Sequence, residues 1–410
     1  MAFPSPLKLI AVTPLPPAPT GVADYSELLL TGLARATDWK IEAISPTVRR
    51  DFAFTVTAPE SFVPPDERDV LFYHVGNSRH HDFVYPFLLQ HRGVLVLHDL
   101  ALHHARLMSY LESPEVRAYR DDLADLEKRR RALAKLGEYR KASAEAYAKN
   151  GETIAEIALR MGGGRLLYDY PLFEDLVRRS RRTIVHSESA REEVVARCPD
   201  ADVRRVRMGV PLPQLVSSGE ARRRLGLSPS AVLLTSFGLV TPEKRITAAI
   251  RALARMRAAG MDAHYLLVGD GVPHYDPLEE AQALGVAEHV RPAGRVSDDA
   301  FTLYAFASDL CLNLRYPSAG ETSATLLRLL GCGRPVVVTN QVHVGDLPQD
   351  VVARSELEGE EDGLYCDLMD LIRSERRRRE LGENARRFAE REASVEIMVA
   401  DYVEALQSAG

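Results

Sequence analysis

The segment DLCLNLRYPSAGETSATLLRLLGCGRPVVV, residues 309–338, contains a strand, a loop of small residues, a helix and a second strand. The helix is indicated by apolar residues at helical spacing, Leu326, Leu327, Leu329 and Leu330. The runs on either side are short and almost wholly apolar, which is typical of parallel strands buried on both faces. The segment therefore predicts one βαβ unit of a parallel sheet.

Similar short apolar runs recur ahead of helical patterns along the whole chain. They are KLIAV at 8–12, VLVL at 94–97, TIVHS at 183–187, VLLTSFG at 232–238, HYLLVGDG at 264–271 and PVVVT at 335–339. Amphipathic stretches such as 25–34 and 245–256 lie between them. We predict an α/β protein with two Rossmann-like, doubly wound parallel sheets that face a cleft.

The domain division is predicted from length and from turn residues. A chain of 410 residues with 46% hydrophobic residues suits two domains. MGVPLPQL, residues 208–215, ends a strand in glycine and prolines, so we place the domains at 1–213 and 214–385. A charged helical insertion is expected at about 110–165, and a C-terminal helix, 386–410, is expected to pack back towards the first domain.

Charge and cysteine content exclude several classes of protein. The chain has 52 basic and 58 acidic residues, a net charge of −6, so no global field favours nucleic acid. The four cysteines lie far apart and fit neither a zinc motif nor a disulfide framework. The first residues lack the apolar core of a signal peptide, and no run is long enough to span a membrane. We expect a cytoplasmic protein; peripheral contact with the inner face of the cell membrane stays open, and the oligomeric state is not predicted.

The insertion has two interpretations. Its clustered Lys and Arg residues suit anionic lipid or a glycan carrier. Acidic residues are interspersed among them, which favours an ordinary solvated helix face. The arginine runs at 178–182 and 376–379 are likewise interpreted as solvated helix ends.

Two strand-to-helix turns in the second half have the features of an anion site. FGLVTPEKRITAAIRAL puts Lys244 and Arg245 where a strand ends and a helix begins. Free N–H groups and the helix dipole make such a turn suitable for phosphate. The other turn is the Gly320–Ser323 loop, in which Glu321, Thr322 or Ser323 is expected to begin the helix, with Arg315 just before it.

These segments together resemble the retaining GT-B glycosyltransferases of family four, in a bacterial subgroup. FGLVTPEKR resembles the phosphate-binding turn of that family, YLLVGDG its next strand end, and AGETSATLLRLLGCGRPVVV its carboxylate motif. PPAPTGVADYS, YHVGNSRHHDF and VLVLHDLALHH resemble segments of the first domain, so the likeness covers almost the whole chain. The resemblance implies the GT-B fold, with the acceptor in the first domain and the nucleotide sugar in the second.

The resemblance also implies a role for individual residues. Lys244 would neutralise the donor diphosphate, Glu321 would bond donor-sugar hydroxyls, and His98 would sit beside the reacting sugar. The remaining donor-binding residues implied in this way are Gly21, Gly320, Thr322 and Ser323.

The sequence departs from the family pattern at three positions. Where the family has two glutamates seven residues apart, this chain has Gly320, followed by Glu321, and Arg328. Where the family often has arginine after the glycine of the phosphate turn, it has Leu239. We hypothesise that Arg245 or Arg315 supplies the missing charge.

The first half is rich in histidine, which leaves three interpretations open. His98, Asp99 and His103 lie close enough in sequence to consider a metal, but no ligand pattern supports one and the fold generally works without it. The interpretation we favour has Asn77, Asp99, His103 and His104 lining the acceptor site. A purely structural role for any of these histidines stays open.

The expected function is metal-independent, retaining transfer of a hexose from a nucleoside diphosphate sugar to a glycan, a lipid-linked or a small-molecule acceptor, as in bacterial polysaccharide biosynthesis. No cofactor is expected beyond this co-substrate. Two alternatives are an epimerase or phosphorylase on the same scaffold, and a non-catalytic partner subunit. Donor sugar, nucleobase and acceptor are not readable from these motifs.

Overall fold

The computed structural model describes residues 7–49, 51–64, 66, 69–357 and 360–408. Contacts divide the chain into two units, which are described separately. Unit 1 comprises the chain up to Arg207, the tetrapeptide Ala319–Thr322 and the chain from Met398 onward. Unit 2 comprises Met208–Ser318 and Ser323–Ile397, so it begins a few residues before the boundary proposed from the sequence at 213.

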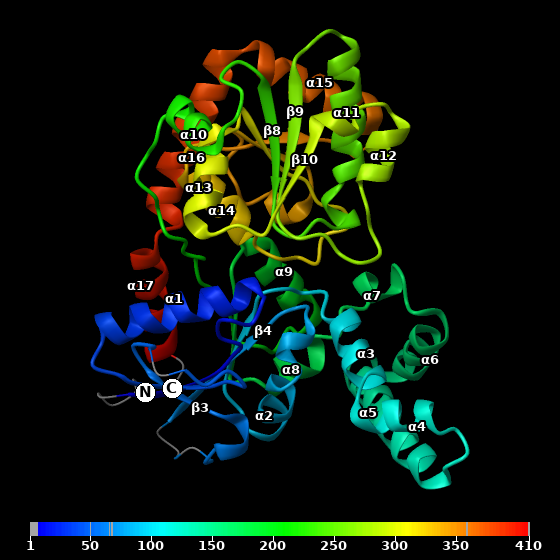
Figure 1. Ribbon diagram of the computed structural model, residues 1–410. Helices are drawn as coiled ribbons and strands as arrows, with labels where there is room; N and C mark the ends of the chain where they lie inside the picture. The colour runs from blue at the N-terminus through cyan, green and yellow to red at the C-terminus, as the bar shows by residue number, and fades with distance from the viewer. Residues whose placement is uncertain (1–6, 50, 65, 67–68, 358–359, 409–410) are drawn as a thin grey trace. The chain divides into compact units, whose positions relative to one another are not determined.

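Unit 1 contains a seven-stranded parallel sheet in the order β3-β2-β1-β4-β5-β6-β7 (Figure 1). Its strands are β1 (Lys8–Val12), β2 (Lys40–Ile44), β3 (Thr55–Thr57), β4 (Val70–Val75), β5 (Val94–Leu97), β6 (Arg182–Val185) and β7 (Val203–Arg205). Every residue of β4, β5 and β6 is buried, as expected for strands covered on both faces. The strand order reverses between β1 and β4, where ligands of such sheets usually bind.

Ten α-helices and three 3₁₀ turns of the described chain accompany this sheet. The helices are α1 (Gly21–Ala36), α2 (Val84–Gln90), α3 (His103–Leu111), α4 (Pro114–Asp121), α5 (Leu126–Tyr147), α6 (Gly151–Met161), α7 (Leu166–Asp169), α8 (Glu174–Arg179), α9 (Glu188–Arg197) and α17 (Val395–Gln407). The turns are η1 (Pro59–Ser61), η2 (Arg79–His81) and η3 (Ala148–Asn150).

The predicted insertion is a helical arm made of α4, α5 and α6, which projects away from the sheet of unit 1 (Figure 1). Its basic side chains pair with neighbouring acids: Glu127 with Arg130 and Arg131, and Lys135 with Glu138, all on α5. Such exposed pairs contribute little stability, but they neutralise the basic face. The contacts favour the solvated interpretation of the arm.

The C-terminal segment is two helices, whereas the sequence pattern suggested one. α16 (Glu375–Glu392) ends before Ala393, and α17 belongs to unit 1 from Met398. The Tyr25 hydroxyl of α1 donates to Tyr402 of α17 at 2.8 Å, and Arg182 donates to the Ser408 hydroxyl at 2.8 Å. The predicted contact between the C-terminal helix and the first domain is confirmed.

The interpretation of residues 178–182 as a solvated helix end holds for Arg178 and Arg179, which end α8, but is wrong for Arg182, which is buried on β6. The Arg182 side chain is buried and bonds the end of α17 as well as Asp202. Arg178 donates to the carbonyl of Glu145 at 2.9 Å, and Arg179 pairs with the Glu145 carboxylate at 2.8 Å. Arg178 and Arg179 thus bond α5, and Arg182 bonds the end of α17. A charge pattern along the sequence does not reveal such contacts.

Unit 2 contains a six-stranded parallel sheet in the order β10-β9-β8-β11-β12-β13. Its strands are β8 (Val232–Phe237), β9 (Ala263–Val268), β10 (Val290–Gly294), β11 (Leu310–Asn313), β12 (Val336–Thr339) and β13 (Ala353–Ser355). The order reverses between β8 and β11, the two strands followed by the predicted phosphate turn and by the Gly320 loop. The predicted pair of doubly wound sheets is therefore confirmed.

The helices of unit 2 follow its strands in alternation. They are α10 (Ser218–Leu225), α11 (Ile246–Ala258), α12 (Leu278–Ala283), α13 (Asp298–Ala307), α14 (Ala324–Gly331), α15 (Glu360–Arg373) and α16, with the 3₁₀ turns η4 (Pro242–Lys244), η5 (Ala287–His289) and η6 (Val342–Val344). Across the described parts of both units, no helix combines the length and apolarity needed to cross a membrane.

Candidate functional site

Polar residues follow the central strands of unit 1 at their carboxyl ends. Asn77 follows β4, His98 and Asp99 follow β5, and His186 follows β6. The Asn77 N–H donates to Asp99 Oδ2 at 2.7 Å, and both residues are partly exposed. A Cβ on Gly76 would lie 2.9 Å from Asp99 Oδ2, so a larger residue at this position would push the Asp99 carboxylate aside. The predicted acceptor residues Asn77 and Asp99 are thus brought together.

His98 is buried beside a second histidine. His98 Nε2 lies 2.9 Å from His74 Nδ1, and the rings stack with centroids 5.2 Å apart. Burial, with a smaller contribution from His186, lowers the pKa of His98 well below its usual value, and burial does the same for His74. Both rings are therefore neutral near pH 7.

The hydrogen-bond network assigns the tautomers of this pair. His74 Nε2 is buried without a hydrogen-bond partner among the described residues. If His98 donated to His74, that orphaned nitrogen would carry an unpaired N–H, which is costly to bury. The arrangement we infer has His74 Nδ1–H donating to His98 Nε2, which leaves the proton of His98 on Nδ1.

The aromatic surroundings of His98 were not selected from the sequence. The Tyr25 ring meets His98 edge-on at 4.8 Å between centroids, and His186 lies at 5.2 Å. Tyr25 in turn bonds Tyr402, so α17 supports the position of the ring. Tyr25 could have been suspected, because it lies in the PPAPTGVADYS segment that resembles the first domain of the family. No feature of the sequence near His186 indicated that it would lie beside His98.

Gly21 is the first residue of α1, at the reversal of the sheet order. The N-cap residue Thr20 makes no side-chain cap bond. A Cβ added to Gly21 would have no heavy atom within 4 Å. The backbone at this helix start is therefore open to close approach by a ligand, and the protein itself does not require glycine here.

His103 and His104, adjacent in sequence, have opposite environments. His104 is exposed at the start of α3. His103 is buried; its Nε2 lies 2.7 Å from the Tyr139 hydroxyl, its Nδ1 lies 2.5 Å from the Tyr170 carbonyl oxygen, and burial lowers its pKa to about 4. Both ring nitrogens of His103 therefore have a partner within the protein. We no longer include His103 among the residues expected to bind the acceptor.

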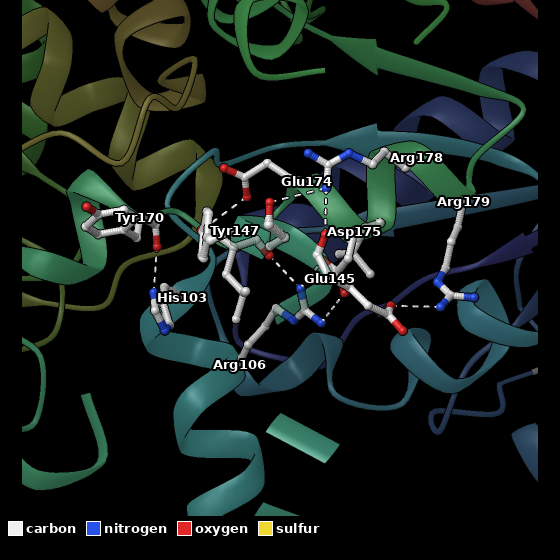
Figure 2. A network of polar contacts seen from close by, with 12 residues as sticks. His103, Arg106, Glu145, Tyr147, Tyr170, Glu174, Asp175, Arg178 and Arg179 are labelled. Atoms are coloured by element: carbon white, nitrogen blue, oxygen red, sulfur yellow. Dashed lines mark hydrogen bonds and ion pairs between the residues drawn. The ribbon is translucent and has the colours of Figure 1, made fainter. Parts of the chain in front are cut away.

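The contacts of His103 extend a network that holds α3 and α5 to α8 (Figure 2). Arg106 of α3 makes a buried bidentate pair with Asp175, at 2.6 and 2.8 Å. The Tyr147 hydroxyl at the end of α5 donates to Glu174 at 3.1 Å. These bonds fix α3, the helix that carries His104.

In unit 2, the predicted phosphate turn brings Lys244 against the carboxyl end of β8. Lys244 Nζ donates to the Phe237 carbonyl. Gly238 has φ +81°, and a Cβ there would lie 2.6 Å from that Nζ and 3.8 Å from Thr325 Oγ1 at the start of α14. Lys244 and the start of α14 therefore meet over Gly238.

Arg245 and Arg315 meet on one residue that sequence reasoning missed. Thr339, the last residue of β12, accepts through Oγ1 from Arg245 Nη1 at 2.9 Å and from the Arg315 N–H at 3.1 Å. Arg245 is buried, with φ +53°, whereas Arg315 is partly exposed. One indication of Thr339 was present in the sequence: the predicted strand PVVVT ends in this threonine, and ligand-binding turns were already predicted after two other strands of the same half.

In the Gly320–Ser323 loop, a glycine with positive φ is followed by a serine that caps the next helix, as its small residues suggest. Gly320 has φ +75°, a conformation that glycine adopts easily. Ser323 is the N-cap of α14 and accepts from the Leu326 N–H at 3.2 Å, while Thr322 precedes it. Glu321 Oε2 accepts from the Ala319 N–H at 2.9 Å.

Two residues that depart from the family pattern, Arg328 and Leu239, have different surroundings. Arg328 pairs with Asp298 at 2.8 Å and lies over the Phe301 ring at 3.9 Å, so α13 holds its guanidinium. Leu239 follows Gly238 with 54% of its surface exposed.

Among the described residues, no group of three His, Cys, Asp or Glu side chains is arranged to hold a metal ion. The positive charge at the carboxyl edge of unit 2 comes from Lys244, Arg245, Arg315 and the start of α14. Such a set of donors suits an anionic group that gains charge during a reaction.

Comparisons with known proteins show a similarity that includes this edge of unit 2. Residues 231–368 match the family model described as Glycosyl transferases group 1. A GDP-mannose-dependent monoacylated alpha-(1-6)-phosphatidylinositol monomannoside mannosyltransferase from Corynebacterium glutamicum is 28% identical over 195 residues, covering 46% of this chain and 50% of that protein. An alpha-monoglucosyldiacylglycerol synthase from Streptococcus pneumoniae is 28% identical over 144 residues, covering 35% and 32%.

The chain thus spans half or less of the length of these curated relatives. Among solved structures, Anabaena HepE in complex with UDP-glucose has a TM-score of 0.64 at 14% identity, covering 98% of this chain and 100% of its own. That likeness concerns the fold. Residues 231–368 are thus similar to the group 1 glycosyltransferases, and the two parallel sheets of the chain have the GT-B fold.

Proposed function

We propose that the protein transfers a hexose from a nucleoside diphosphate sugar to an acceptor with retention of anomeric configuration, without a metal. The observation that carries the proposal is the cationic edge of unit 2, where Lys244 and the start of α14 meet over Gly238 at the reversal of the sheet order. The leaving group in this reaction is a diphosphate, so catalysis needs positive charge where negative charge develops.

The donor-binding residues follow from their positions. Lys244 would exchange its bond to the Phe237 carbonyl for a diphosphate oxygen, and the N–H groups near Thr322 and Ser323 would face the same anion. The Glu321 carboxylate would accept from donor-sugar hydroxyls. Gly21 and Gly320 would let backbone approach the donor closely.

Arg315 is our choice for the positive charge that, by the family resemblance, is often present at the position of Leu239. It is partly exposed, whereas Arg245 is buried and donates to Thr339. Arg245 then acts by holding Thr339, which orients Arg315. If neither Arg245→Ala nor Arg315→Ala weakened donor binding, this compensation would be wrong.

The chemical step we favour is front-face displacement. The bond from the anomeric carbon to the diphosphate oxygen breaks, the acceptor oxygen bonds to the same face, and its proton passes to the departing phosphate. Neutral His98, protonated on Nδ1, would bond the sugar beside the reacting carbon.

The acceptor would contact Asn77, Asp99 and His104, which lie at or near the carboxyl edge of unit 1. A glycan, a lipid-linked or a small-molecule acceptor stays in the proposal, since two relatives are named for lipid acceptors. UDP-glucose, named with HepE, is the first donor to test.

The test uses the full-length protein with a panel of UDP-, GDP- and ADP-sugars. Thermal stabilisation and release of nucleoside diphosphate are measured for the wild type and for Lys244→Gln, Glu321→Gln and His98→Ala. Lys149→Gln, on the arm, is the matched charge control. We expect one nucleotide to stabilise the wild type, with turnover reduced at least 100-fold in Lys244→Gln and unchanged by EDTA.

The products separate the alternatives. A free nucleotide sugar with inverted stereochemistry would indicate an epimerase, and sugar phosphate formed from a glycan would indicate a phosphorylase. Absence of stabilisation by any nucleotide would favour a non-catalytic subunit. Wild-type turnover in Glu321→Gln would remove the central carboxylate assignment.

A further inference from the structure

A second concave surface of unit 2 lies at the amino ends of β11 and β12, away from the carboxyl edge just described. It is a pocket of about 570 Å³ between α16, the segment that enters β11 and the turn from α14 to β12. α14 and α16 lie on the same flank of unit 2 (Figure 1). β12 separates the two sites by four residues, about 13 Å of strand.

Glycine shapes the floor of this pocket, which we call the α16 pocket. Gly333 has φ +63°, and a Cβ on Gly382 would lie 2.4 Å from the Gly333 carbonyl oxygen. The backbones of the α14–β12 turn and of α16 are therefore in direct contact. This close approach brings the arginines of both segments around one concavity.

The α16 pocket is rich in arginine. Its charged lining consists of Arg334, Arg378, Arg379, Arg386 and Arg387, with Asp309, Glu375 and Glu383. Asp309 already pairs with Arg222 at 2.7 Å, and Arg386 with Glu390 at 2.6 Å. The pocket thus holds more guanidinium groups than nearby carboxylates can neutralise.

Four of the five arginines make no ion pair with any described residue. Arg378 donates to the Leu371 carbonyl at 2.8 Å, and Arg387 bonds the Asn384 side chain at 2.5 Å. The Arg379 side chain makes no hydrogen bond or ion pair with any described residue and is exposed. These side chains keep donors available for a ligand.

The environment of Arg334 is a second, independent indication that an anion binds in the α16 pocket. Its Nη2 donates to the Ser308 carbonyl, but its Nε is buried without a hydrogen-bond partner among the described residues. Burial lowers the pKa of this guanidinium, so its charge is poorly compensated by the protein. Buried unpaired donors are costly, and a bound anion would remove that cost.

We propose that the α16 pocket binds a multiply charged phosphate anion of the diphosphate class, separately from the sugar donor. Guanidinium groups bind phosphate oxygens through paired, charge-assisted bonds, and several of them around one cavity match an anion with several charges. The proposal adds a binding role to the arginine run 376–379, which from its sequence pattern is interpreted as a solvated helix end.

The experiment is calorimetric titration of the full-length protein with pyrophosphate. We expect two sites, of which one is weakened about tenfold by Arg379→Gln and further by Arg379→Gln/Arg387→Gln, and the other by Lys244→Gln. Both pocket arginines are exposed, so the variants should fold. Arg391→Gln, on α16 but outside the pocket lining, is the matched control.

Hydrogen exchange locates the sites. Pyrophosphate should protect peptides covering 332–335 and 375–387 even in Lys244→Gln, which separates this proposal from the transferase proposal. A single site, lost in Lys244→Gln and unchanged in Arg379→Gln/Arg387→Gln, would overturn it. So would equal binding of citrate in the pocket, because the site would then not distinguish phosphate from carboxylate. UDP as a third titrant tells whether a nucleoside diphosphate or only the free anion is bound.

Discussion

The 2.9 Å contact between His74 Nδ1 and His98 Nε2 makes His74 a positioning residue in our proposal. His74→Leu removes the donor that fixes the tautomer of His98, while His74→Asn retains an N–H near the Nδ1 position. We expect kcat to fall about tenfold in the Leu variant with donor KM almost unchanged, because one hydrogen bond of about 1–1.5 kcal/mol is lost. The Asn variant should recover most of that rate in steady-state assays.

Thermal unfolding of both variants controls for packing, since His74 also contacts Phe72 and Tyr25. Equal loss of kcat in His74→Leu and His74→Asn would mean that His74 only fills space.

Gly21 offers a separate test of ligand approach. Gly21→Ala adds a methyl group that meets no protein atom within 4 Å, so stability should be unchanged or rise by roughly 0.5–1 kcal/mol. If the donor lies against this backbone, kcat/KM should nevertheless fall at least tenfold. The control is Gly219→Ala, near the start of α10, where an added Cβ also meets open space. Kinetics of Gly21→Ala equal to those of the control would exclude close approach at this position.

At the scale of elements, the Arg106–Asp175 pair joins α3 to α8 (Figure 2). Both side chains are 2% exposed, so Arg106→Met leaves a buried carboxylate without its partner. We expect a loss of about 3–5 kcal/mol in the free energy of unfolding, measured by urea denaturation, with faster hydrogen exchange in α3. Asp175→Leu combined with Arg106→Met should recover part of it, because the unpaired charge is gone.

Arg117→Gln is the matched control on α4. The Arg117–Glu112 pair is exposed, so its loss should cost less than about 1 kcal/mol. If Arg106→Met destabilised the protein as little as this control, the buried pair would not hold α3 to α8.

The elements also show the limits of sequence prediction. The six apolar runs predicted as strands coincide with β1, β5, β6, β8, β9 and β12, because buried parallel strands are almost continuously hydrophobic. The outer strands β3, β7 and β13 have three residues each, and β10 contains proline and glycine with two exposed positions. Edge strands are buried less, so they carry little hydrophobic signal.

At the scale of the whole molecule, the buried histidines make unit 1 sensitive to acid. In five described histidines of unit 1, burial lowers the pKa: His81, His103 and His186 to about 4, and His74 and His98 well below the usual value. The unfolded chain binds these protons near pH 6.5, so it binds more protons than the folded state at pH 5. Stability is therefore full above about pH 6.5 and falls as the pH drops.

We expect unit 1 to lose several kcal/mol between pH 7 and pH 5, at up to about 1.4 kcal/mol per pH unit for each histidine. Urea unfolding followed by hydrogen exchange in each sheet measures the two units separately. In His103→Gln, the number of protons taken up when unit 1 unfolds should be lower by about one, so its free energy of unfolding should depend less on pH. A pH-independent stability of unit 1 in this range would contradict the burial of neutral histidines.

The sequence by itself determined what depends on neighbours along the chain: hydrophobic runs specified two parallel sheets, and small or basic residues after strands indicated the turns around Lys244 and Ser323. Tertiary structure decided which distant residues meet. Arg245 and Arg315 both donate to Thr339, His74 Nδ1 lies against His98 Nε2, and His103 is buried while His104 is exposed. The reason is physical: periodicity reports burial of a segment, whereas hydrogen-bond partners and pKa values depend on packing between segments.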